Sequence, residues 1–294
     1  MSQSQSSASS AQDIPEMPRP GLLRRLAERR SPRRVKVSFS LRFYAEVLKL
    51  DHLHYGLWDG EGLGIDGLRS AQQRYSDTLA SWIPDGVHHV LDVGSGIGTF
   101  ARMLKRRGYD VEGLSPDPYQ QEAFERRVGS PFHLARFQEF QPRKAYDLVM
   151  MSESVQYIWL DRLFPAVRRA VPDGYLLLAD YFRRPGVTGK SSGHDLDAFM
   201  KAAEDAGLVL EDQRDITEET LPTLDLARQW LENHIDPTAS LLADTIESRY
   251  PRLFWLGKKL LKGKLDKVEQ DRLLVDSDHF RATKKYLIMR FRTA

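Results

Sequence analysis

A glycine-rich run in the first third of the chain restricts the fold more than any other feature. The letters VLDVGSGIGTF, residues 90–100, place apolar residues before Asp92 and glycines at 94, 96 and 98, and the helical pattern ARMLKRRG follows. Glycines in such a turn let the backbone approach a ligand because they carry no Cβ, and the start of the helix supplies free N–H donors. The run therefore predicts a strand, a ligand-binding turn and a helix. A tight strand-to-helix connection without a ligand is the alternative.

Short apolar runs alternate with helical patterns from Pro84 onward, which is typical of βαβ units and a parallel sheet. We expect seven strands, at 89–93, 110–114, 132–135, 146–151, 175–180, 208–215 and 285–291. Helices are expected at 98–108, 117–127, 160–171 and 195–206, the last with Asp195 as its cap. The predicted fold class is therefore α/β.

The chain is expected to divide into five segments. Residues 1–18 are rich in Ser, Gln and Ala and cannot bury enough apolar surface to fold. Residues 39–50 and 66–83 have helical periodicity, and an aromatic, glycine-rich loop lies between them. The helical stretch 217–283 is too long for an ordinary connection. The predicted segments are a disordered tail (1–18), N-terminal helices with a lid loop (19–84), a cofactor-binding core (85–216), a helical cap or lid insertion (217–283) and the last core strand (284–294).

The charge of the chain is unevenly distributed. Its formal net charge is +2 at pH 7, yet residues 19–36 hold eight Lys or Arg and one acid, and residues 249–267 hold seven and one. The remaining residues are therefore acidic overall. The two basic segments suit contact with an anionic membrane surface, and they also suit ordinary solvated surface. The acidic remainder and the lack of a base-reading motif argue against nucleic acid as a partner.

Several kinds of site and segment are excluded by composition. The absence of cysteine excludes disulfides, cysteine-ligated zinc, iron–sulfur clusters and a cysteine nucleophile. No apolar run approaches the roughly 20 residues that span a bilayer, and the first residues lack the basic and apolar regions of a secretory signal. The histidines and carboxylates show no H-x-x-x-H-like spacing, so no metal is expected. The expected location is the cytoplasm, with peripheral membrane contact as a further hypothesis.

The acid before the first glycine decides between cofactors. A dinucleotide fingerprint needs its third glycine at position 99, where the chain has Thr99, and Asp92 would repel an anionic pyrophosphate. A cationic amino acid that carries a sulfonium would be attracted. The acid followed by G-x-G-x-G, from Asp92 to Gly98, resembles the first motif of the class I S-adenosylmethionine-dependent methyltransferases. The resemblance covers residues 50–215 and implies a Rossmann-like, doubly wound, seven-stranded sheet with an antiparallel last strand.

The resemblance also implies where S-adenosyl-L-methionine would bind. Most of the family ends its second strand in an acid that holds the ribose, whereas this chain has Ser115-Pro116 followed by Gln120, which is similar to cyclopropane-fatty-acid synthases and tocopherol-type or sterol-type C-methyltransferases. Glu112 and Asp117 are the competing acids, and Glu112 suits the sheet face better. The implied cofactor contacts are Tyr55, Asp92, Gly94, Ser95, Gly96, Gly98, Ser115, Pro116, Gln120, Phe137, Gln138 and Ser152.

Residues after the third and fourth expected strands are implied to face the ligands. Phe137 and its polar neighbour Gln138 match the place where the family grips adenine, although Phe137 and Phe140 also suit the core. Glu153 and Tyr157 follow the fourth strand, where the family places the methionine moiety and the acceptor.

The loop His54-Tyr55-Gly56-Leu57-Trp58 is unusually aromatic for a surface segment, since an exposed Tyr and Trp would leave apolar area in water. It resembles the H-Y-G-x-W element of tocopherol-like and sarcosine-type methyltransferases, in which the tyrosine covers the cofactor and the loop closes over the acceptor. A base is needed only if the acceptor must lose a proton. The predicted catalytic residues are His54, Glu153 and Tyr157, and Asp59 and His194 are also in reach by position.

The predicted function is transfer of a methyl group from S-adenosylmethionine to a small, lipophilic acceptor in lipid or secondary metabolism. Methylation at carbon, oxygen or nitrogen stays open, as do the acceptor and the oligomeric state. A non-catalytic scaffold that keeps the fold is the main alternative. A dehydrogenase is a third, and it is opposed by Thr99 and by the missing acid at 115.

Overall fold

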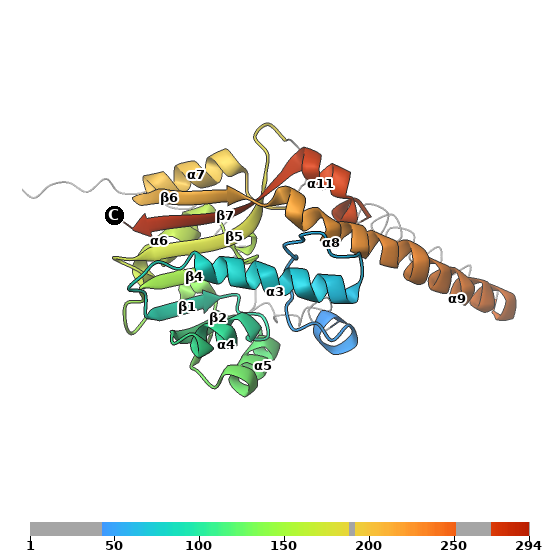
Figure 1. The fold of residues 1–294 in the computed structure, drawn as a ribbon, viewed down its shortest axis with the longest axis horizontal. Coiled ribbons are helices and arrows are strands. Elements are labelled where there is room, and N and C mark those ends of the chain that lie inside the picture. Colours follow the sequence, from blue (N-terminus) through green and yellow to red (C-terminus); the bar gives the residue numbers. More distant parts are fainter. Residues whose placement is uncertain (1–42, 188–191, 251–271, 294) are drawn as a thin grey trace, which may run out of the picture. The chain divides into compact units, whose positions relative to one another are not determined.

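The computed structural model describes residues 43–187, 192–250 and 272–293. It contains a seven-stranded sheet with the order β3-β2-β1-β4-β5-β7-β6 (Figure 1). The strands are β1 (His89–Val93), β2 (Asp110–Ser115), β3 (Phe132–Leu134), β4 (Leu148–Ser152), β5 (Tyr175–Arg183), β6 (Leu208–Asp215) and β7 (Lys284–Thr293). The first five strands pair in parallel, and β7 is antiparallel to both β5 and β6. The predicted Rossmann-like sheet and its antiparallel last strand are confirmed.

Helices cover both faces of the sheet, because side chains alternate along each strand. Val90 of β1 joins the core on one face, and its neighbour Leu91 joins the core on the other. The Leu91 face is covered by α6 (Leu160–Ala170) and α7 (Leu196–Asp205). The Val90 face is covered by α3 (Ile65–Ser81), α4 (Thr99–Arg106), α5 (Pro118–Val128), α8 (Thr217–Trp230) and α11 (Ser277–Thr283). In Figure 1, α3 crosses in front of the sheet.

Local signals in the sequence begin and end the helices near the site. The carboxylate of Asp117 accepts the N–H of Tyr119 at 2.9 Å, Pro118 occupies the first turn, and Gly129 ends α5 with a φ of 63°. Asp195 caps α7 in the same way, by accepting a backbone N–H at 3.0 Å. The cap predicted at Asp195 is confirmed.

The stretch between β6 and β7 is helical where it is described. The π-helix η4 (Leu231–Ile235) continues α8 into α9 (Asp236–Arg249), and the short η5 (Arg272–Val275) precedes α11. None of the residues of α9 is buried, and this helix extends away from the sheet in Figure 1. The described parts of this stretch are therefore helical, and its role as a cap insertion stays a prediction.

The helix predicted over 39–50 is wrong at its C-terminal end. Of its described residues only Phe43–Val47 are helical, as the π-helix η1. Lys49 adopts a φ of 52°, and the N–H of Leu50 donates to the carbonyl of Tyr44 at 3.0 Å. A residue in the left-handed region reverses the chain, so the helix cannot continue.

One strand also starts later than expected. The strand predicted from residue 146 begins at Leu148, because the N–H of Tyr146 donates to the carbonyl of Ala170 in α6. The division into five segments stays a prediction. The tail 1–18 and the basic segment 19–36 lie outside the described residues, as does nearly all of the second basic segment. Within the described ranges, no helix has the length and apolar content to cross a membrane.

Candidate active site

The glycine turn joins β1 to α4 at the carboxyl edge of the sheet. Its glycines all have positive φ, 80° at Gly94, 56° at Gly96 and 82° at Gly98. A Cβ on Gly94 would lie 2.6 Å from the Cβ of Ser154, and a Cβ on Gly98 would lie 2.7 Å from a side chain of α5. A Cβ on Gly96 would meet only Leu53, at 3.6 Å. Packing therefore requires glycine at 94 and 98, whereas Gly96 borders open space that a ligand could use.

Three buried polar atoms near this turn have no hydrogen-bond partner among the described residues. They are Oδ2 of Asp92, Oγ of Ser95 and Oε1 of Gln120, which lies in the first turn of α5. Burial alone raises the pKa of Asp92 to about 7. An unpaired buried polar group costs about 1–3 kcal/mol, which a ligand with N–H, O–H or cationic groups would recover. These residues therefore fit S-adenosylmethionine, which has a sulfonium, an ammonium and ribose hydroxyls.

The two acids that competed for the ribose are engaged elsewhere. Asp117 caps α5, as described above. The carboxylate of Glu112 accepts a 2.6 Å hydrogen bond from the hydroxyl of Tyr146 and pairs with Lys144 at 2.9 Å. The sheet-face interpretation of Glu112 is thus confirmed. The buried Ser115 is left as the polar residue at the end of β2, and its Oγ accepts the N–H of Asp117 at 3.2 Å.

The segment predicted to grip adenine is largely core. Phe137 begins the short helix η2 (Phe137–Glu139) and is 2% exposed, and Phe140 is also buried. Both rings belong to the core cluster on the Leu91 face of the sheet. Gln138 is half-buried, and its carbonyl accepts from the guanidinium of Arg169 at 3.1 Å. The structure thus gives both phenylalanines the packing role that the sequence left open.

Glu153 follows directly after β4 in an unusual backbone conformation. Its φ is 51°, and its N–H donates to the carbonyl of Ala179 in β5 at 2.8 Å. Its Oε1 accepts two 2.7 Å hydrogen bonds, from the N–H of Tyr55 and from the hydroxyl of Tyr286. No chain group within the described ranges bonds Oε2. Burial raises the pKa of this carboxyl to about 7, although both hydrogen bonds act to lower it. Left-handed backbone at a non-glycine residue is often found at functional sites.

A chain of hydroxyl groups leads inward from Glu153. The hydroxyl of Tyr286 lies 3.1 Å from that of Tyr75, which in turn lies 3.0 Å from Oγ of Ser152. Tyr75 and Tyr286 are fully buried. Ser152, a predicted cofactor contact, is therefore held by Tyr75 at the end of β4.

His54 is built into the same region but faces the interior. Its Nδ1 bonds the carbonyl of Tyr55 at 2.7 Å, its Nε2 lies 3.1 Å from Oγ of Ser76, and its ring stacks on Tyr75 with centroids 4.1 Å apart. Burial lowers the pKa of His54 to about 3, so the imidazole is neutral at physiological pH. With both nitrogens bonded within the chain, His54 is arranged to position the loop rather than to receive a proton.

The other candidate acids and bases make no hydrogen bond with Glu153 among the described residues. Tyr157, in the short helix η3 (Val155–Tyr157), is 78% exposed, and Asp59 is exposed as well. The Nε2 of His194 bonds the carbonyl of Val155 at 3.1 Å. Of the three predicted catalytic residues, only Glu153 is partly buried among polar partners and has an oxygen that no described residue bonds.

The aromatic loop is fastened over the sheet edge by α8. Oγ1 of Thr223 accepts from the N–H of Gly56 at 3.0 Å and from Nε1 of Trp58 at 2.8 Å. The N–H of Trp58 donates to the carbonyl of Glu219 at 2.8 Å. These bonds explain why the aromatic residues of this loop are largely buried, and they place Tyr55 beside Glu153.

Sequence reasoning missed five residues that complete the site. Asp180, 1% exposed, accepts the N–H of Val155 at 3.0 Å, and burial raises its pKa to about 8. Tyr181, Tyr286 and Phe280 form an aromatic cluster with Tyr55, with centroids 5.6–6.5 Å apart. The fifth residue is the buried Lys284 at the start of β7. The signal in the sequence that could have indicated Asp180 and Lys284 is a polar residue near the end of an apolar strand.

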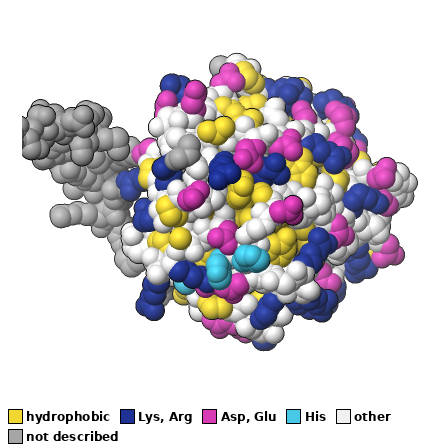
Figure 2. Space-filling model, turned by 60° about the vertical axis from the view of Figure 1, so that its left-hand side comes forward, with side chains coloured by type: hydrophobic (Ala, Val, Ile, Leu, Met, Phe, Trp, Pro, Cys, Tyr) yellow, Lys and Arg dark blue, Asp and Glu magenta, His cyan; other side chains and the backbone are white. Residues whose placement is uncertain are grey.

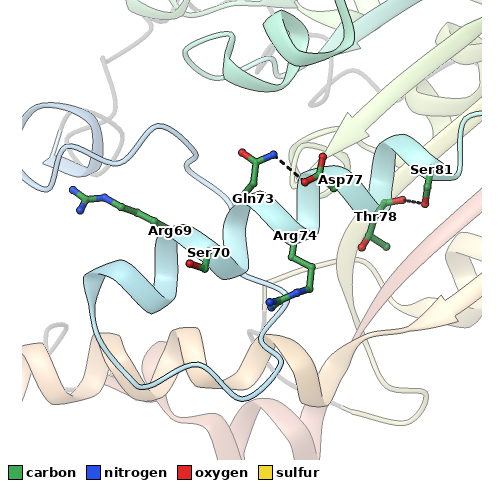
Figure 3. Close-up of a pocket in the computed structure, with 7 residues that line it drawn as sticks. All are labelled: Arg69, Ser70, Gln73, Arg74, Asp77, Thr78 and Ser81. Atoms are coloured by element: carbon green, nitrogen blue, oxygen red, sulfur yellow. Dashed lines mark hydrogen bonds between the residues drawn. The ribbon is translucent and has the colours of Figure 1, made fainter. Parts of the chain in front are cut away.

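Two grooves on the surface lie apart from Glu153. One, of about 720 Å³, runs along α3 and is lined by residues of that helix alone, from Arg69 to Ser81 (Figure 3). The other, of about 490 Å³, lies between η1, Ile97 of the glycine turn and α5. Among the residues that the structure describes, no group of three or more His, Asp or Glu is placed to hold a metal ion.

Comparisons with known proteins agree with this geometry. A family model described as a methyltransferase domain matches residues 67–206. The methyltransferase GfsG of Streptomyces halstedii is 29% identical over 201 residues, which cover 59% of this chain and 71% of that protein.

Solved structures share the fold at lower identity. The [4+2]-cyclase SpnF is 19% identical, with a TM-score of 0.63 over 87% of this chain and 93% of its own. The geranyl diphosphate C-methyltransferase of Streptomyces coelicolor A3(2), solved with Mg²⁺, geranyl-S-thiolodiphosphate and S-adenosyl-L-homocysteine, is 18% identical, with a TM-score of 0.65 over 88% and 94%. At these identities the likeness concerns the fold.

Proposed function

The chain belongs to the S-adenosylmethionine-dependent methyltransferases, and from this premise we propose that it methylates a small, lipophilic acceptor held between Glu153 and the aromatic cluster. The observation that carries the proposal is that the orphaned polar atoms of the glycine turn and the free oxygen of Glu153 lie at one edge of the sheet. Ligands of open α/β sheets bind at the carboxyl ends of the strands.

The residues around the glycine turn would hold the cofactor. Asp92 supplies negative charge for the cationic methionine end, and Ser95 and Gln120 supply unpaired oxygens. Ser115 lies at the end of β2, where the ribose is expected. When bound, S-adenosylmethionine supplies a methyl group on a positively charged sulfur.

The chain itself mainly positions the reactants and excludes water. The loop that carries Tyr55, fastened by Thr223, covers the sheet edge. The described residues hold the carboxylate of Glu153 through Oε1 alone, so Oε2 could accept a proton from an acceptor that must lose one. A base with a pKa near the working pH is well suited to this role.

The lipophilic character of the acceptor is inferred from the rings that surround Glu153. Tyr55, Tyr181, Phe280 and Tyr286 present mostly apolar surface, with hydroxyl groups as the polar elements. Aromatic walls with few polar groups are typical of sites for apolar small molecules.

The test separates methyl transfer from the alternatives. Thermal-shift titration should give a rise in melting temperature with S-adenosylhomocysteine and none with NADH, since a ligand at about 100 times its Kd adds about 2.7 kcal/mol. Transfer of a radiolabelled methyl group to lipophilic acceptor candidates should follow. Cofactor binding without transfer to any acceptor would favour a scaffold or a different reaction, since the [4+2]-cyclase SpnF shares this fold.

Contact with an anionic membrane remains a separate proposal. It is supported by Leu241, Leu242 and Ile246, which α9 exposes, and by the basic sequence that follows this helix. On the face shown in Figure 2, cationic and anionic side chains are interspersed, so the described surface there adds no basic patch. Co-sedimentation with anionic liposomes, compared between the whole chain and a chain lacking residues 19–36, would test the N-terminal segment as the anchor. The cytoplasmic location likewise stays a prediction.

A further inference from the structure

Lys284 is the most deeply buried cation of the described chain. It is 6% exposed, and no other Lys or Arg in the described ranges is buried. Lys284 begins β7 and pairs with Arg183 at the end of β5. Because β7 runs antiparallel to β5, its start lies at the same sheet edge as Glu153.

The ammonium of Lys284 lies in an aromatic cage. Nζ is 4.3 Å from the ring centroid of Tyr181 and 5.3 Å from that of Phe280, and it donates to Oγ of Ser192 at 2.9 Å. Within the described residues it makes no ion pair with a carboxylate. Burial lowers the pKa of Lys284 to about 8, and the field of Asp180 opposes that shift. The ammonium thus has donor capacity that no other described residue uses.

The aromatic cage of Lys284 adjoins Tyr286, one of the residues that hold the carboxylate of Glu153. The ring of Tyr181 lies 6.5 Å from the ring of Tyr286, whose hydroxyl donates to Glu153. The ring of Tyr55 is 6.1 Å from that of Phe280. A molecule that reaches Glu153 through the aromatic cluster therefore comes within the field of Lys284.

Because the cage already contains the ammonium of Lys284, its usual preference for cationic ligands is reversed. Aromatic faces attract ammonium groups, and empty cages of this kind bind cationic ligands. Here the side chain of Lys284 takes that place, so a second cation meets like-charge repulsion at low dielectric, whereas an anion meets an ammonium with unused donors.

We propose that Lys284 selects for a methyl acceptor that carries a carboxylate and against one that carries an amine. This proposal rests on the proposed function, because it concerns the acceptor side of the same site. It deepens that function by giving the lipophilic acceptor one anionic end.

The test uses three probes of one shape and different charge. Phenylacetate, 2-phenylethanol and 2-phenylethylamine are titrated by NMR into the whole chain saturated with S-adenosylhomocysteine, and Kd values in the millimolar range are expected for fragments of this size. In the wild type, phenylacetate should bind at least about tenfold more tightly than the amine. In Lys284→Met, the amine should become the tightest of the three, since the cage then holds no cation to repel it.

Control variants distinguish the charge of Lys284 from that of a neighbouring cation. Lys285→Met removes the neighbouring cation, which is partly exposed and lies 3.4 Å from Asp215, and it should retain the wild-type order. Lys284→Arg should also retain the preference for phenylacetate, and Lys284→Gln replaces Lys284→Met if the latter does not fold. An order that is the same in wild type and in the neutral variant, tighter binding of the amine by the wild type, or no saturable binding of any probe would each overturn the proposal. Failure of the wild type to bind S-adenosylhomocysteine would instead overturn the proposed function.

Discussion

The backbone N–H of Tyr55 donates a 2.7 Å hydrogen bond to Oε1 of Glu153, which lies 98 positions later in the chain. This bond joins the aromatic loop to the end of β4, and the hydroxyl of Tyr286 completes the arrangement from β7. Three distant segments therefore orient one carboxylate, and its other oxygen is left without a partner among the described residues.

Replacing Glu153 should change the dependence of kcat on pH if this residue acts as a base. With a pKa of about 7, the carboxyl is protonated below that pH, so kcat should fall about tenfold per pH unit on the acid side. Glu153→Gln should lower kcat by about 10²–10⁴-fold and remove this acid limb. The measurement is kcat against pH with a saturating acceptor. An unchanged profile in Glu153→Gln would show that no proton passes to this residue.

Tyr286→Phe should shift the same limb in a defined direction. The hydroxyl of Tyr286 stabilises the carboxylate and so lowers the pKa of Glu153, while burial raises it. Loss of the hydroxyl should therefore move the acid limb of kcat to higher pH, with the affinity for S-adenosylhomocysteine unchanged. Tyr157→Phe, at an exposed ring, is the control and should leave the limb in place. A limb that moves to lower pH in Tyr286→Phe would contradict the assignment.

Binding of S-adenosylmethionine should weaken as the pH falls below about 7. Burial raises the pKa of Asp92 to about 7 in the cofactor-free protein, and only the ionised form attracts a cation. Calorimetry should show proton release on binding at pH 6 and little at pH 8. Asp92→Asn should bind more weakly at pH 8 and lose the pH dependence. A wild-type affinity that does not change between roughly pH 6 and 8 would remove Asp92 from the site.

Gly96→Asp should abolish binding of S-adenosylhomocysteine in a folded protein. The site of the new Cβ is open except for Leu53, so the side chain enters the space assigned to the ligand. Gly86→Asp is the matched control, because Gly86 has a φ of 83° and a Cβ there would meet no atom within 4 Å. Both variants should lose about 1 kcal/mol through left-handed backbone strain. Chemical denaturation measures that loss, and calorimetry should detect binding only in the control.

Thr223→Val should loosen the aromatic loop. The substitution leaves the N–H of Gly56 and Nε1 of Trp58 without their acceptor, at a cost of about 1–3 kcal/mol for each donor that stays buried. Hydrogen exchange at Gly56 should accelerate, and KM for the acceptor should rise. Thr238→Val is the control and should change neither, because the hydroxyl of Thr238 in α9 donates to the carbonyl of His234 in η4. Unchanged exchange at Gly56 would mean that Thr223 does not fasten the loop.

The amino-acid sequence alone determined the fold of the core and the position of the cofactor turn. Strand and helix periodicity, the glycines at 94, 96 and 98, and Asp92 act within a few neighbouring residues, so they can be read locally. The seven strands were predicted for this reason, whereas the antiparallel last strand was implied by the resemblance to the methyltransferase family. The C-terminal end of the helix over 39–50 was predicted wrongly, because the left-handed turn at Lys49 depends on a single backbone choice that periodicity does not reveal.

Only the tertiary structure decided which polar residues meet. His54 and Tyr157 had the same standing as Glu153 in the sequence, yet one is bonded inside the loop and the other is exposed. Tyr286 and Lys284 gave no motif at all, because their significance comes from β7 lying beside β5 at the sheet edge. Burial and long-range pairing set the pKa values and the charge of the site, and both depend on residues that are more than a hundred positions apart in the chain.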